Sequence, residues 1–397
     1  MEYRTLPHGG EKIGVIGMGA SVIGARPESE IITAVRAAVE SGVNYFDLAA
    51  GHATVFPAYG KALADLRKSV CLQIHFGADY TSGEYGWTTE KDEIQRSVAW
   101  QLRNLGTDYI DFGFIHCLDE ESDLAAYEKN GVLAYVQDLK AQGVIRHLGL
   151  SSHTPALANK VLDLGIVDVL MFSVNPVYDY GQGDYGIGSA AERHDLYCRC
   201  QREGVGITVM KPFSGGQLLD AAKSPFGRAL TKAQCIQYAL DKPGVVTVLP
   251  GFGDEKEMRE VLQYFDTPAE ERDYACLGEF APPESAGRCV YCKHCHPCPA
   301  GLDIALINKY YDLARLGDKL AREHYLTLER TASDCPLPAA TATAAVPSMC
   351  PRASGWRPSA PTSESERPGR PGILPGARFP AHSPETARRG WKIVPFP

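Results

Sequence analysis

The sequence has no long hydrophobic run and no excess of positive charge, and each absence removes a class of protein. No apolar stretch approaches the ~18 residues that a membrane span requires, and residues 1–4 do not resemble the start of a signal peptide. We therefore expect a cytoplasmic protein without a membrane partner. The formal net charge of −8 argues against nucleic acid as the main partner.

The spacing of the cysteines is also not typical of a disulfide framework. The chain has 12, and four of them crowd together as Cys289, Cys292, Cys295 and Cys298. Thiols this close indicate metal binding rather than disulfides. The pattern C-x2-C-x2-C-x2-C-P resembles bacterial ferredoxins, in which three thiolates hold one [4Fe–4S] cluster and the fourth ligates its neighbour. Flanking histidines leave zinc as an alternative, but the Cys-Pro ending favours iron–sulfur.

Strand-like and helical segments alternate along most of the chain. Several strands are continuously apolar, as parallel strands buried on both faces must be. Eight such units in about 250 residues predict an α/β fold, a (β/α)8 TIM barrel. The expected strands are 13–17, 43–48, 70–76, 109–115, 147–150, 169–174, 206–210 and 245–249. Six expected helices lie near 30–41, 58–67, 89–105, 193–203, 232–240 and 255–264; a further helix ends at about 141, and another begins at 155.

Polar side chains stand where three of these strands end. Asp47 closes the apolar run 43–46, and a short turn delivers His52 five positions later. The strands at 70–76 and 109–115 end in the same way, in His75 and His116. Catalytic side chains of β/α barrels lie at these carboxyl ends, so we expect the four residues to face one pocket. A helix N-cap role for Asp47 is the plainer alternative.

At this point the residues resemble a known family, the aldo/keto reductases. The resemblance runs in order over roughly the first 265 residues, and the Cys-rich segment is similar to the branch with a ferredoxin-like extension. It implies a barrel that binds NAD(P)H and transfers hydride to or from a small carbonyl or alcohol. The segments that carry it are VNYFD (43–47), GKAL (60–63), LGTDYID (105–111), His116, GVIR (143–146), LGLSSH (148–153) and MKP (210–212).

The resemblance also implies an active site of Asp, Tyr, Lys and His, in which Tyr donates the proton. Asp47 and His116 keep their places in this chain, whereas His52 occupies the Tyr position and His75 the Lys position. Tyr59 falls at a helix-core position and does not replace the missing Tyr. Imidazole titrates near neutrality, so we expect His52 to be the acid/base, with His75 stabilising the developing alkoxide.

Two alternatives to this chemistry stay open. Three imidazoles and a carboxylate at a barrel mouth could also bind a divalent metal ion, which would make Asp47, His52, His75 and His116 its ligands. A barrel that has lost hydride chemistry is the other alternative, because a fold does not imply a function.

Cofactor contacts follow from the resemblance alone. It places the nicotinamide amide at Ser151 and Ser152, after the fifth strand. The pyrophosphate and adenosine fall after the seventh and eighth strands, where barrels commonly bind phosphate. The residues expected there are Lys211, Pro212, Gly215, Gly251 and Gly253.

These features divide the chain into a barrel at 1–270, a small α-helical ferredoxin-like [4Fe–4S] domain at 271–334 and a disordered tail at 335–397. Helical runs at 304–316 and 319–328 would form the scaffold of the cluster domain. A cluster fused to a hydride-transfer barrel suggests electron exchange with a ferredoxin or flavoprotein, although a purely structural cluster is the alternative.

The tail differs in composition from the rest of the chain. Residues 335–397 hold 13 of the 27 prolines, and their eight Lys and Arg against three Glu give +5, which leaves −8 − 5 = −13 for residues 1–334. Back-translation of residues 338–347 in a shifted frame permits C-S-Y-C-Y-S-R-C-P. With Cys335, that run would complete a second C-x2-C-x2-C-x3-C-P motif. We therefore expect a frameshift after Cys335 that removed a second cluster site.

Overall fold

The computed structural model describes residues 1–181, 186–280, 298, 300–315 and 321–334. The chain divides into two compact units, Met1–Tyr274 and Ala275–Pro397. Among the described helices, none combines the length and the apolar character needed to cross a membrane. The predicted tail and most of the Cys-rich motif lie outside the described residues.

The first unit is built on eight parallel strands in sequential order. Backbone bridges from Ile16 to Val248 and from Gly19 to Gly251 join the two edges, so the sheet closes into a barrel. The predicted (β/α)8 order is thereby confirmed. The strands are β3 (Met18–Gly19), β4 (Tyr45–Asp47), β5 (Cys71–Phe76), β8 (Ile110–Ile115), β9 (Ile145–Ser152), β10 (Val169–Ser173), β11 (Gly206–Met210) and β12 (Val245–Val248).

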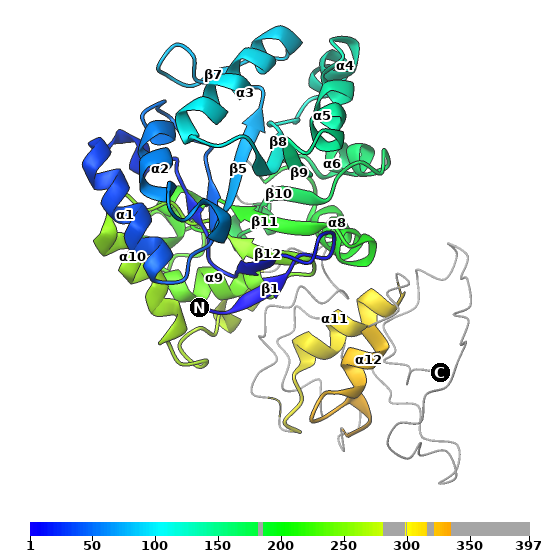
Figure 1. The fold of residues 1–397 in the computed structure, drawn as a ribbon. Coiled ribbons are helices and arrows are strands. Elements are labelled where there is room, and N and C mark those ends of the chain that lie inside the picture. Colours follow the sequence, from blue (N-terminus) through cyan, green and yellow to red (C-terminus); the bar gives the residue numbers. More distant parts are fainter. Residues whose placement is uncertain (182–185, 281–297, 299, 316–320, 335–397) are drawn as a thin grey trace. The chain divides into compact units, whose positions relative to one another are not determined.

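Helices surround this sheet, as Figure 1 shows for α1, α2 and α10 on one side and α4, α5 and α6 on another. They pack closely: a Cβ on Gly60 of α2 would lie 2.4 Å from the backbone oxygen of Asn104 in α3. The helices are α1 (Glu28–Glu40), α2 (Val55–Leu63), α3 (Lys91–Leu105), α4 (Glu121–Lys129), α5 (Val132–Ala141), α6 (Pro155–Leu162), α7 (Pro176–Asp179), α8 (Ala190–Glu203), α9 (Lys232–Leu240) and α10 (Glu255–Leu262).

Large apolar side chains fill the barrel interior. Tyr45 and Phe112 are fully buried, with ring centroids 5.0 Å apart, and Met171 packs in the same cluster. Barrel cores of this kind are packed rather than hollow, which leaves the strand ends and their loops to form a site.

Two expected elements differ from the structure. The predicted strand 13–17 is divided: β2 (Lys12–Gly14) pairs antiparallel with β1 (Tyr3–Thr5), whereas Ile16 and the following β3 join the barrel. The helix expected to run to about 141 is two helices, α4 and α5, which break at Asn130 and Gly131. Gly131 has a φ of 71°, a left-handed conformation that ends a helix.

The second unit contains α11 (Ile304–Arg315) and α12 (Ala321–Leu326), which confirms helices in both predicted runs. Leu302, Ile307 and Tyr325 form a small core, and the half-buried Cys298 packs against it. Cys289, Cys292 and Cys295 lie outside the described residues, so the predicted cluster stays a prediction.

Candidate active site

Three of the predicted residues meet at the carboxyl ends of neighbouring strands. Asp47 is the last residue of β4, His75 lies near the end of β5, and His116 follows β8. Because β4, β5 and β8 are adjacent and parallel, these ends share one edge of the sheet. His75 Nε2 lies 2.8 Å from Asp47 Oδ1, and His75 Nδ1 lies 3.0 Å from His116 Nδ1. All three side chains are buried.

Tyr85 extends this set toward solvent. Its hydroxyl lies 2.9 Å from His116 Nε2, and the residue is 44% exposed. It belongs to the segment between β5 and α3, where β6 (Ala78–Asp79) and β7 (Gly86–Trp87) form a short hairpin. We call Asp47, His75, His116 and Tyr85 the mouth network. Tyr85 is a residue that sequence reasoning missed.

Hydrogen-bond directions in the mouth network follow from its buried end. An ionised Asp47 accepts from His75 Nε2–H, which leaves His75 Nδ1 to accept from His116 Nδ1–H. His116 Nε2 then accepts from the Tyr85 hydroxyl. The side-chain amide of Gln73 also lies 3.0 Å from His75 Nε2, and its oxygen accepts from the Tyr45 hydroxyl at 2.6 Å; the reversed amide would place the oxygen toward His75 and the nitrogen toward Tyr45. The four side chains of the mouth network thus form one continuous chain of hydrogen bonds.

Burial sets the protonation of the outer members. It lowers the pKa of His116 well below its ordinary value, and repulsion from His75 lowers it further. Burial, and next the nearby Cys117, raise the pKa of Tyr85 to about 12. At neutral pH His116 is therefore uncharged, and Tyr85 keeps its proton.

His52 lies apart from the mouth network. Its half-exposed side chain, 44% accessible, pairs with Glu84 through a 3.1 Å contact between Nδ1 and Oε2. A backbone bridge joins the same two residues. Tyr59 is fully buried in α2 with its ring edge against Phe46, in agreement with its expected place in the core.

A second row of charged residues lies beside His116. Asp119 Oδ2 is 2.9 Å from His153 Nδ1, and His153 Nε2 is 2.9 Å from Lys211 Nζ. Burial opposes the ionisation of Asp119, but the hydrogen bonds from His153 and Ser152 and the charge attraction of His153 together outweigh it and hold the pKa of Asp119 below its ordinary value. Burial lowers the pKa of Lys211. Of these three, Lys211 had been placed near the site from the sequence, as a cofactor residue.

The predicted cofactor residues after β11 form an unusual backbone. Lys211 and Ser214 have φ values of 55° and 50°, and Gly215 and Gly216 follow at 63° and 87°. These positive φ values turn the chain sharply, and the Ser214 and Gly216 N–H groups donate to the Lys211 and Phe213 carbonyls at 3.0 Å. A Cβ on Gly215 or Gly216 would meet no atom within 4 Å, so space is open there.

The other cofactor candidates have partners within the protein. Ser152 is fully buried and donates its hydroxyl to the Leu118 carbonyl at 2.6 Å, and Ser151 is buried as well. Gly253 donates its backbone N–H to Glu257 at 2.7 Å. Gly251 faces Val22, whose Cγ2 a Cβ would approach to 2.8 Å. Ser152 therefore supports the loop after β8 in this structure.

No metal site is present among the described residues, where no three His, Cys, Asp or Glu side chains converge on one point. Both ring nitrogens of His75 are engaged within the mouth network, and His52 turns to Glu84. The divalent-metal alternative at Asp47, His52, His75 and His116 therefore has no support.

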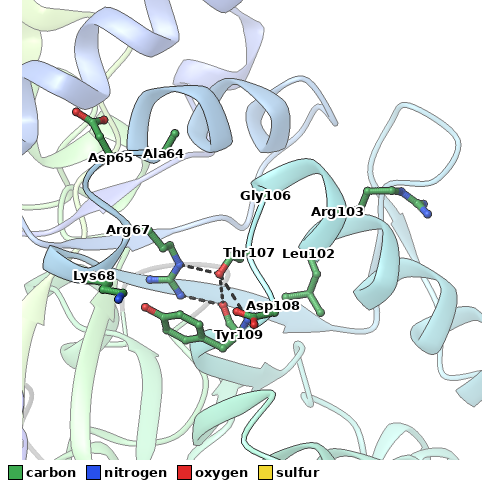
Figure 2. A pocket seen from close by; sticks show the side chains of 10 residues that line it. All are labelled: Ala64, Asp65, Arg67, Lys68, Leu102, Arg103, Gly106, Thr107, Asp108 and Tyr109. Carbon is green, nitrogen blue, oxygen red and sulfur yellow. Dashed lines mark hydrogen bonds between the residues drawn. The ribbon is translucent and has the colours of Figure 1, made fainter.

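A surface hollow lies at the amino ends of β5 and β8 (Figure 2) and is lined by the ends of α2 and α3. Arg67 in its wall donates to Thr107, to the Tyr109 carbonyl and to Asp111. The guanidinium therefore secures the segment before β8. This end of a barrel usually serves stability rather than catalysis.

Comparisons with known proteins agree with this fold. A sequence model described as the aldo/keto reductase family matches residues 15–233. The L-galactose dehydrogenase of Arabidopsis thaliana is 26% identical over 297 residues, which cover 66% of this chain and 86% of that protein. Deoxymugineic acid synthase 1 of Oryza sativa is 24% identical over 274 residues, covering 62% of this chain and 80% of that protein.

Solved structures show the same fold. The holo form of aldo-keto reductase AKR11C1 from Bacillus halodurans has a TM-score of 0.59 at 22% identity, covering 71% of this chain and 96% of that one. An aldo-keto reductase from Klebsiella pneumoniae in complex with NADPH has a TM-score of 0.51 at 20% identity, covering 72% of this chain and 97% of that one.

Proposed function

Because this chain belongs to the aldo/keto reductase family, we propose that it transfers hydride between NAD(P)H and a small carbonyl or alcohol. The observation that carries the proposal is the buried contact of Asp47, His75 and His116 at the strand ends, where the family places its active site. Bound NAD(P)H would supply or accept the hydride. The protein would bind the substrate oxygen and exchange its proton.

The changed residues suit this task. Reduction of a carbonyl leaves negative charge on oxygen, which a fixed N–H or O–H donor stabilises. His75 replaces the Lys of the family and, when protonated, can supply a positive charge beside Asp47. His52 at the Tyr position lies on the rim, where a substrate could reach it. The proposal of atypical histidine chemistry thus rests chiefly on His75 and His116.

Pyrophosphate binding is proposed for the turn after β11. Lys211 would supply an ammonium, and Gly215 with Gly216 leaves open space in the same turn. Asn175 supports this turn, because its side chain donates to the Lys211 carbonyl at 2.8 Å. Pro212, Gly251 and Gly253 complete the proposed contacts, and Ser151 with Ser152 remains the proposed nicotinamide end. The Klebsiella complex supports NADPH as the first cofactor to test.

Fluorescence titration with NADPH and NADH tests the function, and Lys211→Met sharpens the test. We expect saturable binding to the wild type and a Kd about tenfold higher for Lys211→Met, since a charge-assisted hydrogen bond to phosphate is lost. Lys68→Met, beside the hollow of Figure 2, is the matched control and should bind like the wild type. A wild type that binds neither nucleotide would contradict the proposal and favour a barrel without hydride chemistry.

We also propose a [4Fe–4S] cluster on Cys289, Cys292, Cys295 and Cys298, with a ferredoxin or flavoprotein as electron partner. The sequence motif supports it, and Cys298 packs on the small core of the second unit. Iron analysis provides the test: the chain as printed should hold at most about four irons, and a gene restored in frame after Cys335 about eight. Zinc in place of iron would overturn the cluster proposal. An intact reading frame without a second motif would overturn the frameshift proposal.

A further inference from the structure

We propose that Tyr85 is the proton donor of this site and that Asp47, His75 and His116 resupply its proton. This inference rests on the proposed hydride transfer and names the group that completes it. Tyr85, from the loop between β5 and α3, would then take the role of the tyrosine that the family carries after β4. The backbone, the side-chain contacts and the proton count each support the assignment.

The backbone brings Tyr85 next to the position of the missing tyrosine. The Tyr85 N–H donates to the Gly51 carbonyl at 3.3 Å, and the Ala53 N–H donates to the Gly83 carbonyl at 3.1 Å. His52 and Glu84 form the bridge between these two contacts. The two loops thus run antiparallel, with residue 85 beside residues 51 and 52.

Side chains on this pair of loops point in opposite directions. His52 turns outward to Glu84, whereas Tyr85 turns inward, with its ring centroid 5.9 Å from that of His116. The Tyr85 ring also lies edge-on to Tyr80, at 6.0 Å. Tyr80 is held in turn by the Ala50 N–H, which donates to its hydroxyl at 3.0 Å. The Tyr85 hydroxyl is therefore fixed where the buried network meets solvent.

The mouth network has two proton states that differ by one proton. In the state with fewer protons, Asp47 is ionised, both histidines are uncharged, and the Tyr85 hydroxyl donates inward to His116. When one proton is added, His75 carries both N–H groups and faces the Asp47 carboxylate, and His116 then presents Nε2–H to the Tyr85 oxygen. The Tyr85 O–H is released to point at a substrate.

Reduction uses this extra proton. With bound NAD(P)H supplying hydride to the carbonyl carbon, the Tyr85 O–H bond would break and its proton would go to the carbonyl oxygen. His116 Nε2–H returns a proton to Tyr85, and His75 Nδ1–H returns one to His116. The network ends without the extra proton, with Asp47 ionised and both histidines uncharged, and regains one proton from solvent. Alcohol oxidation runs the same steps in reverse.

Charged neighbours are compatible with this role. His116 faces Asp119 and His153 as well as His75, and Tyr85 faces Cys117. Burial followed by Asp119 raises the pKa of the Cys117 thiol to about 11, so this group is neutral near pH 7. Burial and repulsion from His75 hold the pKa of His116 low, so His116 itself does not retain the added proton.

Tyr85→Phe tests the assignment. Reduction should slow by about 100-fold or more, the usual contribution of a positioned general acid, with an unchanged Kd for NADPH. Tyr3→Phe is the matched control, because Tyr3 is 45% exposed and its hydroxyl donates to the Gly42 carbonyl, away from the mouth network. It should retain wild-type turnover. His52→Gln should lose less than Tyr85→Phe.

The pH profile separates catalysis from support. The rate of carbonyl reduction by the wild type should fall as pH rises, because the network loses its extra proton. In Tyr85→Phe the rate should depend much less on pH over the same range. A Tyr85→Phe variant with the wild-type rate and profile would overturn the inference, as would a larger loss in His52→Gln.

A readout without turnover distinguishes failure of this inference from failure of the proposed function. The tyrosinate absorbance difference between wild type and Tyr85→Phe gives the titration of Tyr85 alone. We expect His116→Leu to shift that titration, because the phenol loses its buried partner. An unshifted Tyr85 titration would overturn the proposed proton network even if the enzyme reduces carbonyls. A shifted titration in a protein that binds no nucleotide would contradict only the proposed function.

Discussion

Asp47→Asn is expected to lower the rate of NADPH-dependent carbonyl reduction by about 10²- to 10⁴-fold, the range associated with general acid–base groups. Asp47 is the buried end of the mouth network, and its Oδ1 accepts from His75 at 2.8 Å. Asparagine keeps the shape but removes the negative charge that favours a proton on His75. The network would then rarely hold the extra proton that reduction consumes.

The experiment compares kcat and Kd in the same preparation. The Kd for NADPH should stay near the wild-type value, because Asp47 lies at the acid–base end of the site rather than at the turn after β11. Asp65→Asn is the control, since Asp65 is exposed and pairs with Arg36 at 2.7 Å on the surface. Asp47→Asn turnover within about threefold of the wild type would contradict the assigned role.

The second large effect concerns stability. Arg193 is fully buried in α8, where its Nε lies 2.9 Å from Asp179 Oδ1 and its Nη2 donates to the Ser173 carbonyl at the end of β10. Tyr197 and Tyr238 donate to the same carboxylate at 2.6 and 2.8 Å. Arg193→Met leaves a buried carboxylate without its cation. We expect the free energy of unfolding to fall by about 3–5 kcal/mol.

Urea denaturation measures this loss, and a double variant identifies its cause. Asp179→Asn combined with Arg193→Met should recover part of the stability, because the unpaired charge is removed. Arg36→Met breaks an exposed ion pair instead and should leave the denaturation midpoint unchanged. A loss below about 1 kcal/mol for Arg193→Met, the range of exposed pairs, would show that the buried pair contributes little.

The sequence predicted the barrel well because its signals are periodic or continuous. β11 and α9 match their expected bounds, and β8 is buried throughout, as a continuously apolar parallel strand should be. The first strand was misplaced because residues 13–17 are apolar enough for either a hairpin or a barrel strand. Their division depends on pairing with residues far away in sequence, including Val248.

The site was predictable only where strands end. Asp47, His75 and His116 follow from their places in strand-like runs, and the structure brings them together. Tyr85 could not be found this way, because its position depends on the pairing of two irregular loops at Gly51 and Glu84. The available signal was compositional: residues 77–88 form a long segment after β5 that contains Tyr80, Tyr85 and Trp87.

The most direct test of the central claim is the transfer of label from NADPH that carries deuterium on the transferable nicotinamide position. Wild-type protein is incubated with this cofactor and a panel of small aldehydes and ketones, and the products are analysed by mass spectrometry. The account predicts an alcohol with one deuterium on the former carbonyl carbon, formed far more slowly by Asp47→Asn. Saturable NADPH binding without any labelled alcohol, or equal labelling by Asp47→Asn, would contradict it.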